Sequence, residues 1–316
     1  MLDQQLDAIM KHAQAAGMPD LCDLPPQASR ALYRQILAGA DRPPADVAVA
    51  DRAVPPRGGG TAAVPLRVYA PREPGPHPLV VYYHGGGYVL GDLDGYDSVC
   101  RQLCQDSGAV IVSVDYRLAP EYPFPAAFDD AWAALQWVAA NARELGGEPG
   151  RLGVAGDSAG AVLATAMTLL ARDGDGPRIG FQALVYPPAA GGHDGEFASR
   201  VRHAGGPTLT LRTADYFSRH FFGPTGRSPD SRGAPLLAES LAGLPPALLL
   251  VAGFDPLRDE ALAYGEALQA AGCDVTTVEY AGLAHGFISM AGAVDAARMA
   301  QLQLGQVLRQ RLAVVR

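Results

Sequence analysis

The stretch Gly156-Asp157-Ser158-Ala159-Gly160 decides how the rest of this chain is interpreted. It stands between the apolar run 152–155, typical of a buried strand, and the run 161–167, typical of a buried helix. A serine on so tight a strand-to-helix turn has a strained backbone, and the flanking glycines remove Cβ atoms that would collide there. The pattern predicts that Ser158 is a nucleophile exposed above a sheet. An ordinary glycine-rich turn has the same pattern, so other parts of the chain must decide.

The composition excludes several classes of function. The 316 residues have a formal charge of −8, and no basic block favours nucleic acid or an anionic membrane. No apolar stretch is long enough to span a bilayer, and residues 1–17 lack the apolar core of a signal peptide. We therefore expect a soluble, cytoplasmic protein that binds neither nucleic acid nor membrane.

The cysteines give no clear sign of a metal site. Cys100 and Cys104 are four residues apart and would share one face of a helix, a spacing that also suits two metal ligands. There is no CxxC motif, and no histidine stands beside this pair in the sequence. We therefore expect small buried thiols and no bound metal.

Strands and helices alternate along most of the chain. Strands are predicted at residues 46–54, 64–70, 79–83, 110–114, 152–155, 181–186, 247–252 and 275–280. Helices are predicted at residues 2–16, 28–38, 97–106, 126–141, 214–222, 256–271 and 292–312, and directly after Ser158. This alternation predicts an α/β fold whose mostly parallel sheet is covered on both faces. Only the first two strands, joined by Gly58-Gly59-Gly60, are expected to pair antiparallel.

One stretch interrupts this rhythm. Residues 188–235 contain two glycine pairs, one predicted helix and a tail rich in proline, glycine and serine. We interpret this stretch as an insertion over the carboxyl ends of the strands, where open α/β sheets bind ligands. Together with residues 1–45 it would form a cap on a single domain spanning residues 1–316.

The sequence His84-Gly85-Gly86-Gly87 follows directly on the predicted strand 79–83. Successive glycines allow backbone N–H groups to point at one oxygen without an intervening side chain. We predict that the N–H groups of Gly85 and Gly86, with that of Ala159, form an oxyanion hole. A phosphate-binding or merely flexible loop is the alternative. The side chain of His84 is expected to pin the loop and not to transfer a proton.

A nucleophilic serine needs a base and an acid that orients the base. Asp255 follows an apolar strand, whereas Asp259 and Glu260 lie one turn further on, where a capping or surface role is the ordinary explanation. His285 is the histidine that follows a late strand. The order Ser158, Asp255, His285 is that of an α/β hydrolase, so His285 would take the serine proton and Asp255 would orient it.

With these motifs in place, the chain resembles the bacterial hormone-sensitive-lipase-like (family IV) carboxylesterases of the α/β-hydrolase superfamily. The matching stretches are residues 84–87, 112–121, 156–160, 255–260 and 285–287. The resemblance implies an eight-stranded, mostly parallel sheet, a helical cap over the acyl pocket, and no cofactor. It also implies hydrolysis of short- to medium-chain carboxylic esters. The chain departs from the family at Ala161-Val162 and Gly91-Asp92, where Gly-Asn and Gly-Ser are common, but neither departure removes a reacting group.

Two further sets of residues, charged ones at 115–121 and apolar ones near the motifs, could have either a structural or a functional role. Asp115, Arg117 and Glu121 are expected to form an ion-pair cluster that braces the active-site loops. The candidates for the pocket lining are Tyr88, Val89, Leu90, Phe217, Phe221, Phe287 and Ile288, and for each aromatic residue core packing is an alternative of at least equal weight.

The leading hypothesis is a serine carboxylesterase that forms an acyl-enzyme on Ser158 and acts on a small-molecule ester. An amidase would use the same triad, a lipase would need an interfacial lid, and a non-catalytic small-molecule receptor would not need the triad. Edge strands near the C-terminus leave a homodimer open.

Overall fold

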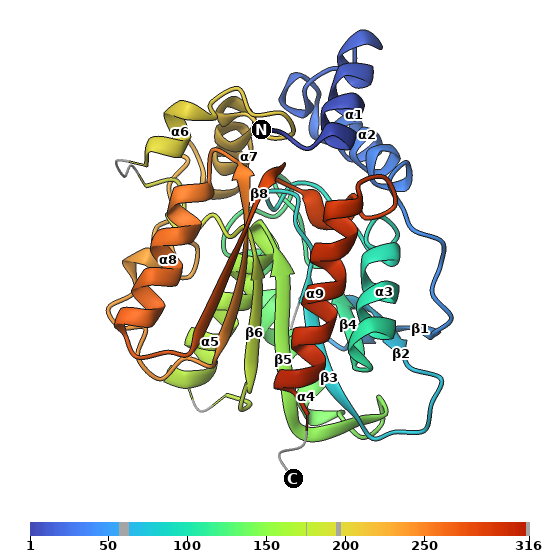
Figure 1. Ribbon diagram of the computed structural model, residues 1–316. Coiled ribbons are helices and arrows are strands. Elements are labelled where there is room, and N and C mark those ends of the chain that lie inside the picture. Colours follow the sequence, from blue (N-terminus) through green and yellow to red (C-terminus); the bar gives the residue numbers. More distant parts are fainter. Residues whose placement is uncertain (57–62, 175, 194–196, 314–316) are drawn as a thin grey trace.

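The computed structural model describes residues 1–56, 63–174, 176–193 and 197–313. In these residues eight strands form one sheet with the order β1-β2-β4-β3-β5-β6-β7-β8 (Figure 1). The strands are β1 (Ala48–Val54), β2 (Val64–Ala70), β3 (His77–Tyr83), β4 (Val110–Val114), β5 (Gly147–Asp157), β6 (Phe181–Val185), β7 (Ala247–Phe254) and β8 (Val275–Ala284). Strands β3 to β8 are parallel to one another, whereas β2 is antiparallel to both of its neighbours. The predicted α/β-hydrolase fold is confirmed.

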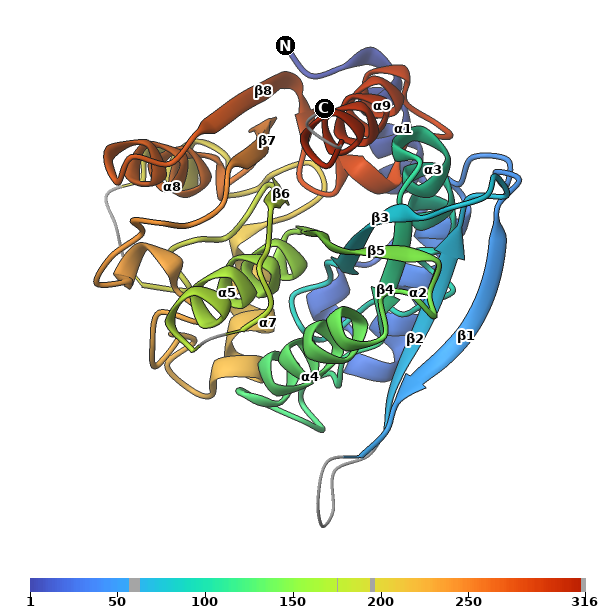
Figure 2. The same cartoon turned by 90° about the horizontal axis from the view of Figure 1, so that it is seen from below.

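Helices cover both faces of this sheet (Figure 2). They are α1 (Gln4–Ala15), α2 (Pro26–Ala38), α3 (Asp97–Ser107), α4 (Ala126–Ala140), α5 (Ala159–Asp173), α6 (Ala198–Arg202), α7 (Leu211–Phe222), α8 (Arg258–Ala270) and α9 (Asp295–Arg311). Apolar residues of α3 and α9 fill the core on one face, and those of α4, α5 and α8 fill it on the other. Along β3, Tyr82 and Tyr83 point to opposite faces and both are fully buried, so the central strands are apolar on both sides. Among the described residues, no helix is both long and apolar enough to cross a membrane.

The expected antiparallel pairing of the first two strands is confirmed, although Gly58–Gly60 lie outside the described residues. Helix α7 begins three residues before the predicted start. The reason is an N-cap: the Thr210 hydroxyl accepts a hydrogen bond from the Thr213 N–H at 3.1 Å. The short helix α6 was not predicted, because five residues are too few to show helical periodicity.

The N-terminal helices and the insertion lie side by side above the carboxyl ends of the parallel strands (Figure 1). Polar contacts join the two segments. The Arg212 guanidinium lies 2.6 Å from the Asp23 carboxylate, and the Thr213 hydroxyl donates to Asp20 at 2.6 Å. The N-terminal helices and the insertion therefore lie where the cap was predicted. That they act as a cap over the acyl pocket stays a prediction.

Candidate active site

The turn between β5 and α5 carries Ser158 in a rare backbone conformation, with φ 52° and ψ −122°. Positive φ strains a residue with a Cβ atom, and such strain is common at functional sites. The turn can close this tightly only because Gly156 and Gly160 have no side chains. A Cβ on Gly160 would overlap the carbonyl of Tyr83, and one on Gly156 would overlap the backbone of Gly160. The sequence motif is thus the steric condition for this turn, which leaves the N-terminus of α5 directly behind the serine.

Ser158, Asp255 and His285 come together at the carboxyl ends of β5, β7 and β8. Nε2 of His285 lies 2.8 Å from Oγ of Ser158, and Nδ1 lies 2.6 Å from Oδ2 of Asp255. Asp255 is fully buried, and its other oxygen accepts the Leu257 N–H at 2.8 Å. A carboxylate that accepts from Nδ1–H leaves Nε2 free to accept the serine proton. The arrangement can therefore activate a hydroxyl for attack on a carbonyl.

The other two acids near Asp255 face the insertion. Asp259 accepts the Ser199 N–H at 2.8 Å. Glu260 is fully buried and bonds to Arg200 and to the Ala190 N–H, so the expected capping or surface role is wrong for Glu260. Burial raises the pKa of the Glu260 carboxyl. Sequence position alone did not indicate this burial, because the residues that cover Glu260 lie about 60 positions earlier in the chain.

The structure corrects one of the three predicted oxyanion donors. The Gly85 N–H donates to Oδ1 of Asp157 at 2.9 Å, so the buried carboxylate beside the serine already takes it. Among the described residues, the N–H groups of Gly86, Gly87 and Ala159 have no hydrogen-bond acceptor. Gly86 and Gly87 have φ values of 115° and 62°, which favour glycine. The free donors of this loop therefore begin one residue later than the sequence predicted.

His84 has the pinning position expected of it. Its Nδ1 bonds to the Gly85 carbonyl at 2.7 Å, and its ring stacks on Tyr116 with centroids 4.3 Å apart. The Tyr116 hydroxyl in turn donates to the His84 carbonyl at 2.6 Å. Burial lowers the pKa of His84 to about 4, so its imidazole is neutral at physiological pH. Through these contacts His84 holds the glycine loop, residues 85–87, in place.

The predicted ion-pair cluster within residues 115–121 is wrong. Arg117 pairs with Asp130 of α4 at 2.8 Å, and Glu121 pairs with Arg30 of α2 at 2.6 Å. Arg30 also donates to the Val89 carbonyl at 2.8 Å, next to the glycine loop. The segment is therefore braced by residues from other elements and not by its own charges.

The structure places both i, i+4 cysteines in the core as free thiols. Cys100 and Cys104 are fully buried on α3, as expected. Burial raises the pKa of the Cys104 thiol to about 12, which keeps it protonated. In the described part of the chain, no group of three or more His, Cys, Asp or Glu side chains could hold a metal ion.

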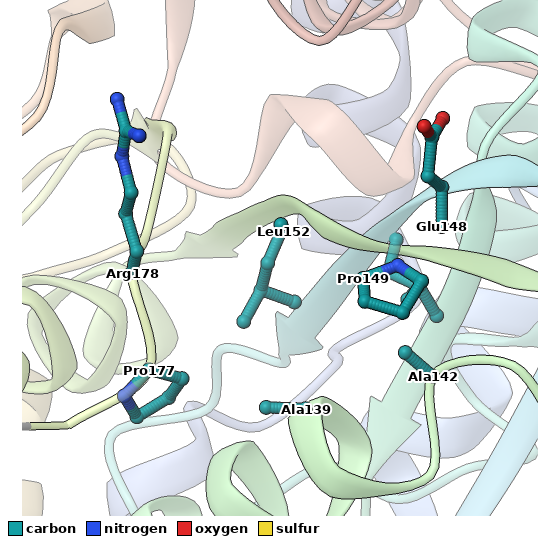
Figure 3. Close-up of a pocket in the computed structure, with 9 residues that line it drawn as sticks. Ala139, Ala142, Glu148, Pro149, Leu152, Pro177 and Arg178 are labelled. Carbon is teal, nitrogen blue, oxygen red and sulfur yellow. The ribbon is translucent and has the colours of Figure 1, made fainter.

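A small cavity lies away from these residues. It has a volume of about 190 Å³ and lies between β5 and α4. Figure 3 shows the residues that line it. It is lined by Leu79, Ala139, Ala142, Glu148, Pro149, Gly150, Leu152, Pro177 and Arg178. Its position near the amino ends of the parallel segments of β3 and β5 separates it from Ser158.

Comparisons with known proteins identify the family of this chain. Residues 80–289 match the model of an alpha/beta hydrolase fold family. The chain is 48% identical over 221 residues to "Esterase LipI" of Mycobacterium tuberculosis, which covers 70% of this chain and 68% of that protein. It is 34% identical over 284 residues to "Ethyl acetate hydrolase" of Pseudomonas putida, which covers 88% and 86% of the two chains.

Solved structures show the same similarity over nearly the whole chain. A hyperthermophilic esterase from the archaeon Pyrobaculum calidifontis superposes with a TM-score of 0.91 at 38% identity. The match covers 99% of both chains. The chain therefore belongs to the hormone-sensitive-lipase-like family of carboxylesterases within the α/β-hydrolase fold.

Proposed function

We propose that this esterase hydrolyses short- to medium-chain carboxylic esters through an acyl-enzyme on Ser158. The observation that carries the proposal is the pair of contacts made by His285, 2.8 Å to Ser158 Oγ and 2.6 Å to the buried Asp255. This linkage of nucleophile, base and orienting acid is the arrangement that activates a serine for acyl transfer.

The reaction would proceed in two steps, acylation of Ser158 and hydrolysis of the acyl-enzyme. Oγ of Ser158 attacks the ester carbonyl while its proton passes to Nε2 of His285, and the carbonyl oxygen becomes an oxyanion. Collapse of this tetrahedral intermediate breaks the C–O bond to the alcohol, which leaves with the proton from His285. Water then attacks the acyl-enzyme, gives its proton to His285, and releases the carboxylic acid as Ser158 regains a proton.

The oxyanion would be held by the N–H groups of Gly86, Gly87 and Ala159. None of the three has an acceptor among the described residues, and Ala159 is the first residue of helix α5, directly after the serine. Donors that are fixed before the reaction need no reorganisation when the charge develops, and each is worth about 3 kcal/mol of barrier. This set replaces the one that included Gly85.

Large rings beside the glycine loop support the short-chain part of the proposal. Phe217 of α7 occupies the space that a side chain at Gly87 would need, and only 8% of Phe217 is exposed. Next to it, Tyr88 and Phe221 stack with centroids 4.0 Å apart. Rings packed this close to the loop leave less room for a long acyl chain, and the similarity to an ethyl acetate hydrolase agrees with this.

The test is hydrolysis of p-nitrophenyl esters from acetate to palmitate by the wild type and by Ser158→Ala. We expect an optimum at short acyl chains, and a loss of at least about three orders of magnitude in kcat in the variant. Turnover that rises only with long chains above their solubility limit would indicate a lipase. Ester turnover that does not depend on Ser158 would contradict the mechanism, and an amide substrate series would then test an amidase.

A further inference from the structure

Asp157, the residue before the serine, occupies the centre of a buried hydrogen-bonded group. It ends β5, and only 2% of it is exposed. Its Oδ1 accepts the Gly85 N–H at 2.9 Å and the Tyr82 hydroxyl at 2.8 Å. Its Oδ2 accepts the hydroxyls of Tyr96 at 3.0 Å and Tyr186 at 3.4 Å. One carboxylate thus joins the glycine loop to three separate parts of the core.

The contact between this carboxylate and the loop is too close to admit any side chain. A Cβ on Gly85 would overlap Oδ2 of Asp157, and it would lie 3.0 Å from the Tyr96 hydroxyl. On the other side of the turn, Gly160 lies directly against the carbonyls of Tyr83 and His84. The loop and the serine turn therefore meet backbone to backbone, with Asp157 as the polar link between them.

The three tyrosine hydroxyls act as hydrogen-bond donors to the Asp157 carboxylate. Tyr82, Tyr96 and Tyr186 are fully buried, and burial raises the pKa of each hydroxyl well above its usual value, so each keeps its proton. The Tyr186 ring also lies 4.5 Å from the ring of His285, centroid to centroid. The group that holds Asp157 is therefore in direct contact with the base as well.

We propose that Asp157 is the positioning residue of the glycine loop, and this inference rests on the esterase function proposed above. By holding the Gly85 N–H, the carboxylate fixes the loop so that the next N–H groups, those of Gly86 and Gly87, are aimed at the carbonyl oxygen of an ester on Ser158. Asp157 touches no reacting atom itself. Its effect falls on the transition state, because the oxyanion exists only there.

This role predicts a separation of kcat from KM. Asp157→Ala removes the acceptor of the Gly85 N–H, and kcat for p-nitrophenyl acetate should fall about 100-fold while KM changes less than about threefold. Asp157→Asn keeps one acceptor oxygen and should recover about tenfold of that loss. Circular dichroism and thermal unfolding establish that the variants are folded. A folded Asp157→Ala variant with kcat within about threefold of wild type would overturn the proposal.

A matched pair of tyrosines tests the same point without changing Asp157. Tyr82 and Tyr83 are consecutive and fully buried, but the Tyr82 hydroxyl donates to Asp157 and the Tyr83 hydroxyl donates to the Ala131 carbonyl at 3.1 Å. Each Phe variant loses one buried hydrogen bond. Tyr82→Phe should lower kcat by about three- to tenfold, and Tyr83→Phe should leave it within about twofold. Equal effects on kcat would show a merely structural role and contradict the proposal.

Amide hydrogen exchange keeps this test independent of ester turnover. Exchange in residues 84–90 should be faster in Asp157→Ala and Tyr82→Phe than in wild type, and unchanged in Tyr83→Phe, because only the first two weaken the anchor of the loop. Unchanged exchange in all three variants would overturn the positioning role. If the wild type shows no Ser158-dependent ester turnover, the proposed function fails while the exchange experiment still decides the role of Asp157.

Discussion

The guanidinium of Arg200, on α6 of the insertion, lies 2.9 Å from the carboxylate of Glu260, on α8. The Glu260 side chain is 1% exposed, and its second oxygen accepts the Ala190 N–H at 2.7 Å. Asp255, the acid that contacts the base, begins the segment in which Glu260 lies five residues further on. This ion pair therefore fastens the insertion to the segment that carries one of the triad residues.

Removal of the positive partner should destabilise the protein strongly. Arg200→Met leaves Glu260 buried without its ion pair, and we expect the free energy of unfolding in urea to fall by about 3 kcal/mol at pH 8. Arg258→Met is the control, because the pairs of Arg258 with Asp259 and Glu279 are both partly exposed, and each should contribute no more than about 1 kcal/mol. Equal losses in the two variants would contradict this difference between buried and exposed pairs.

Asp115 should make stability depend on pH. Burial, together with the charges of Asp92 and Asp94, raises the pKa of Asp115 to about 6 from 3.8. The folded state then binds this proton more tightly than the unfolded chain does. The stability that protonation contributes is full below pH 3.8 and is lost as pH rises through about 6.

Asp115→Asn should prevent the loss of stability at high pH, because the asparagine amide stays neutral. We expect the variant to be more stable than wild type by roughly 1–3 kcal/mol at pH 8, with the difference disappearing toward pH 4. Chemical denaturation at several pH values measures it. Asp215→Asn is the control, because Asp215 lies on α7, is exposed and pairs with Arg219 at 2.7 Å, so its loss should bring no gain at pH 8. If Asp115→Asn were less stable than wild type at pH 8, the attraction of the Asp115 carboxylate to Arg67 and Arg34 would outweigh the cost of its burial, and the prediction would be wrong.

Phe217 should limit the length of the acyl chain. Phe217→Ala opens space beside Gly87, and the ratio of kcat/KM for octanoate to that for butyrate should rise about fivefold or more. Phe222→Ala, on the same helix, removes a ring that packs against Phe124, Phe221 and the edge of Tyr88, whereas the atoms nearest to Gly87 belong to Phe217. It should cost similar stability but change the ratio less than about twofold. A ratio that changes equally in both variants would show a general loosening of α7.

Much of the architecture was determined by the sequence alone, because the signals are local. Continuous apolar runs bounded by glycine and proline marked the strands, and helical spacing marked the helices that cover them. The glycines around Ser158 are a steric requirement of one turn, so the motif itself predicts the geometry of that turn. The order of Ser158, Asp255 and His285 matched that of an α/β hydrolase, and because each follows a parallel strand, all three were expected at one edge of the sheet.

The tertiary structure alone decided which polar groups find each other. The Gly85 N–H was predicted to face the substrate, but it lies against Asp157, which is 72 residues away in sequence. Arg117 pairs with Asp130, and Glu260 is buried under Arg200, 60 residues earlier. Such partners depend on how strands and helices pack across the sheet, and a buried donor or acceptor takes whichever group the packing brings within reach. A sequence pattern specifies the element that carries a polar group, whereas the packed fold specifies its partner.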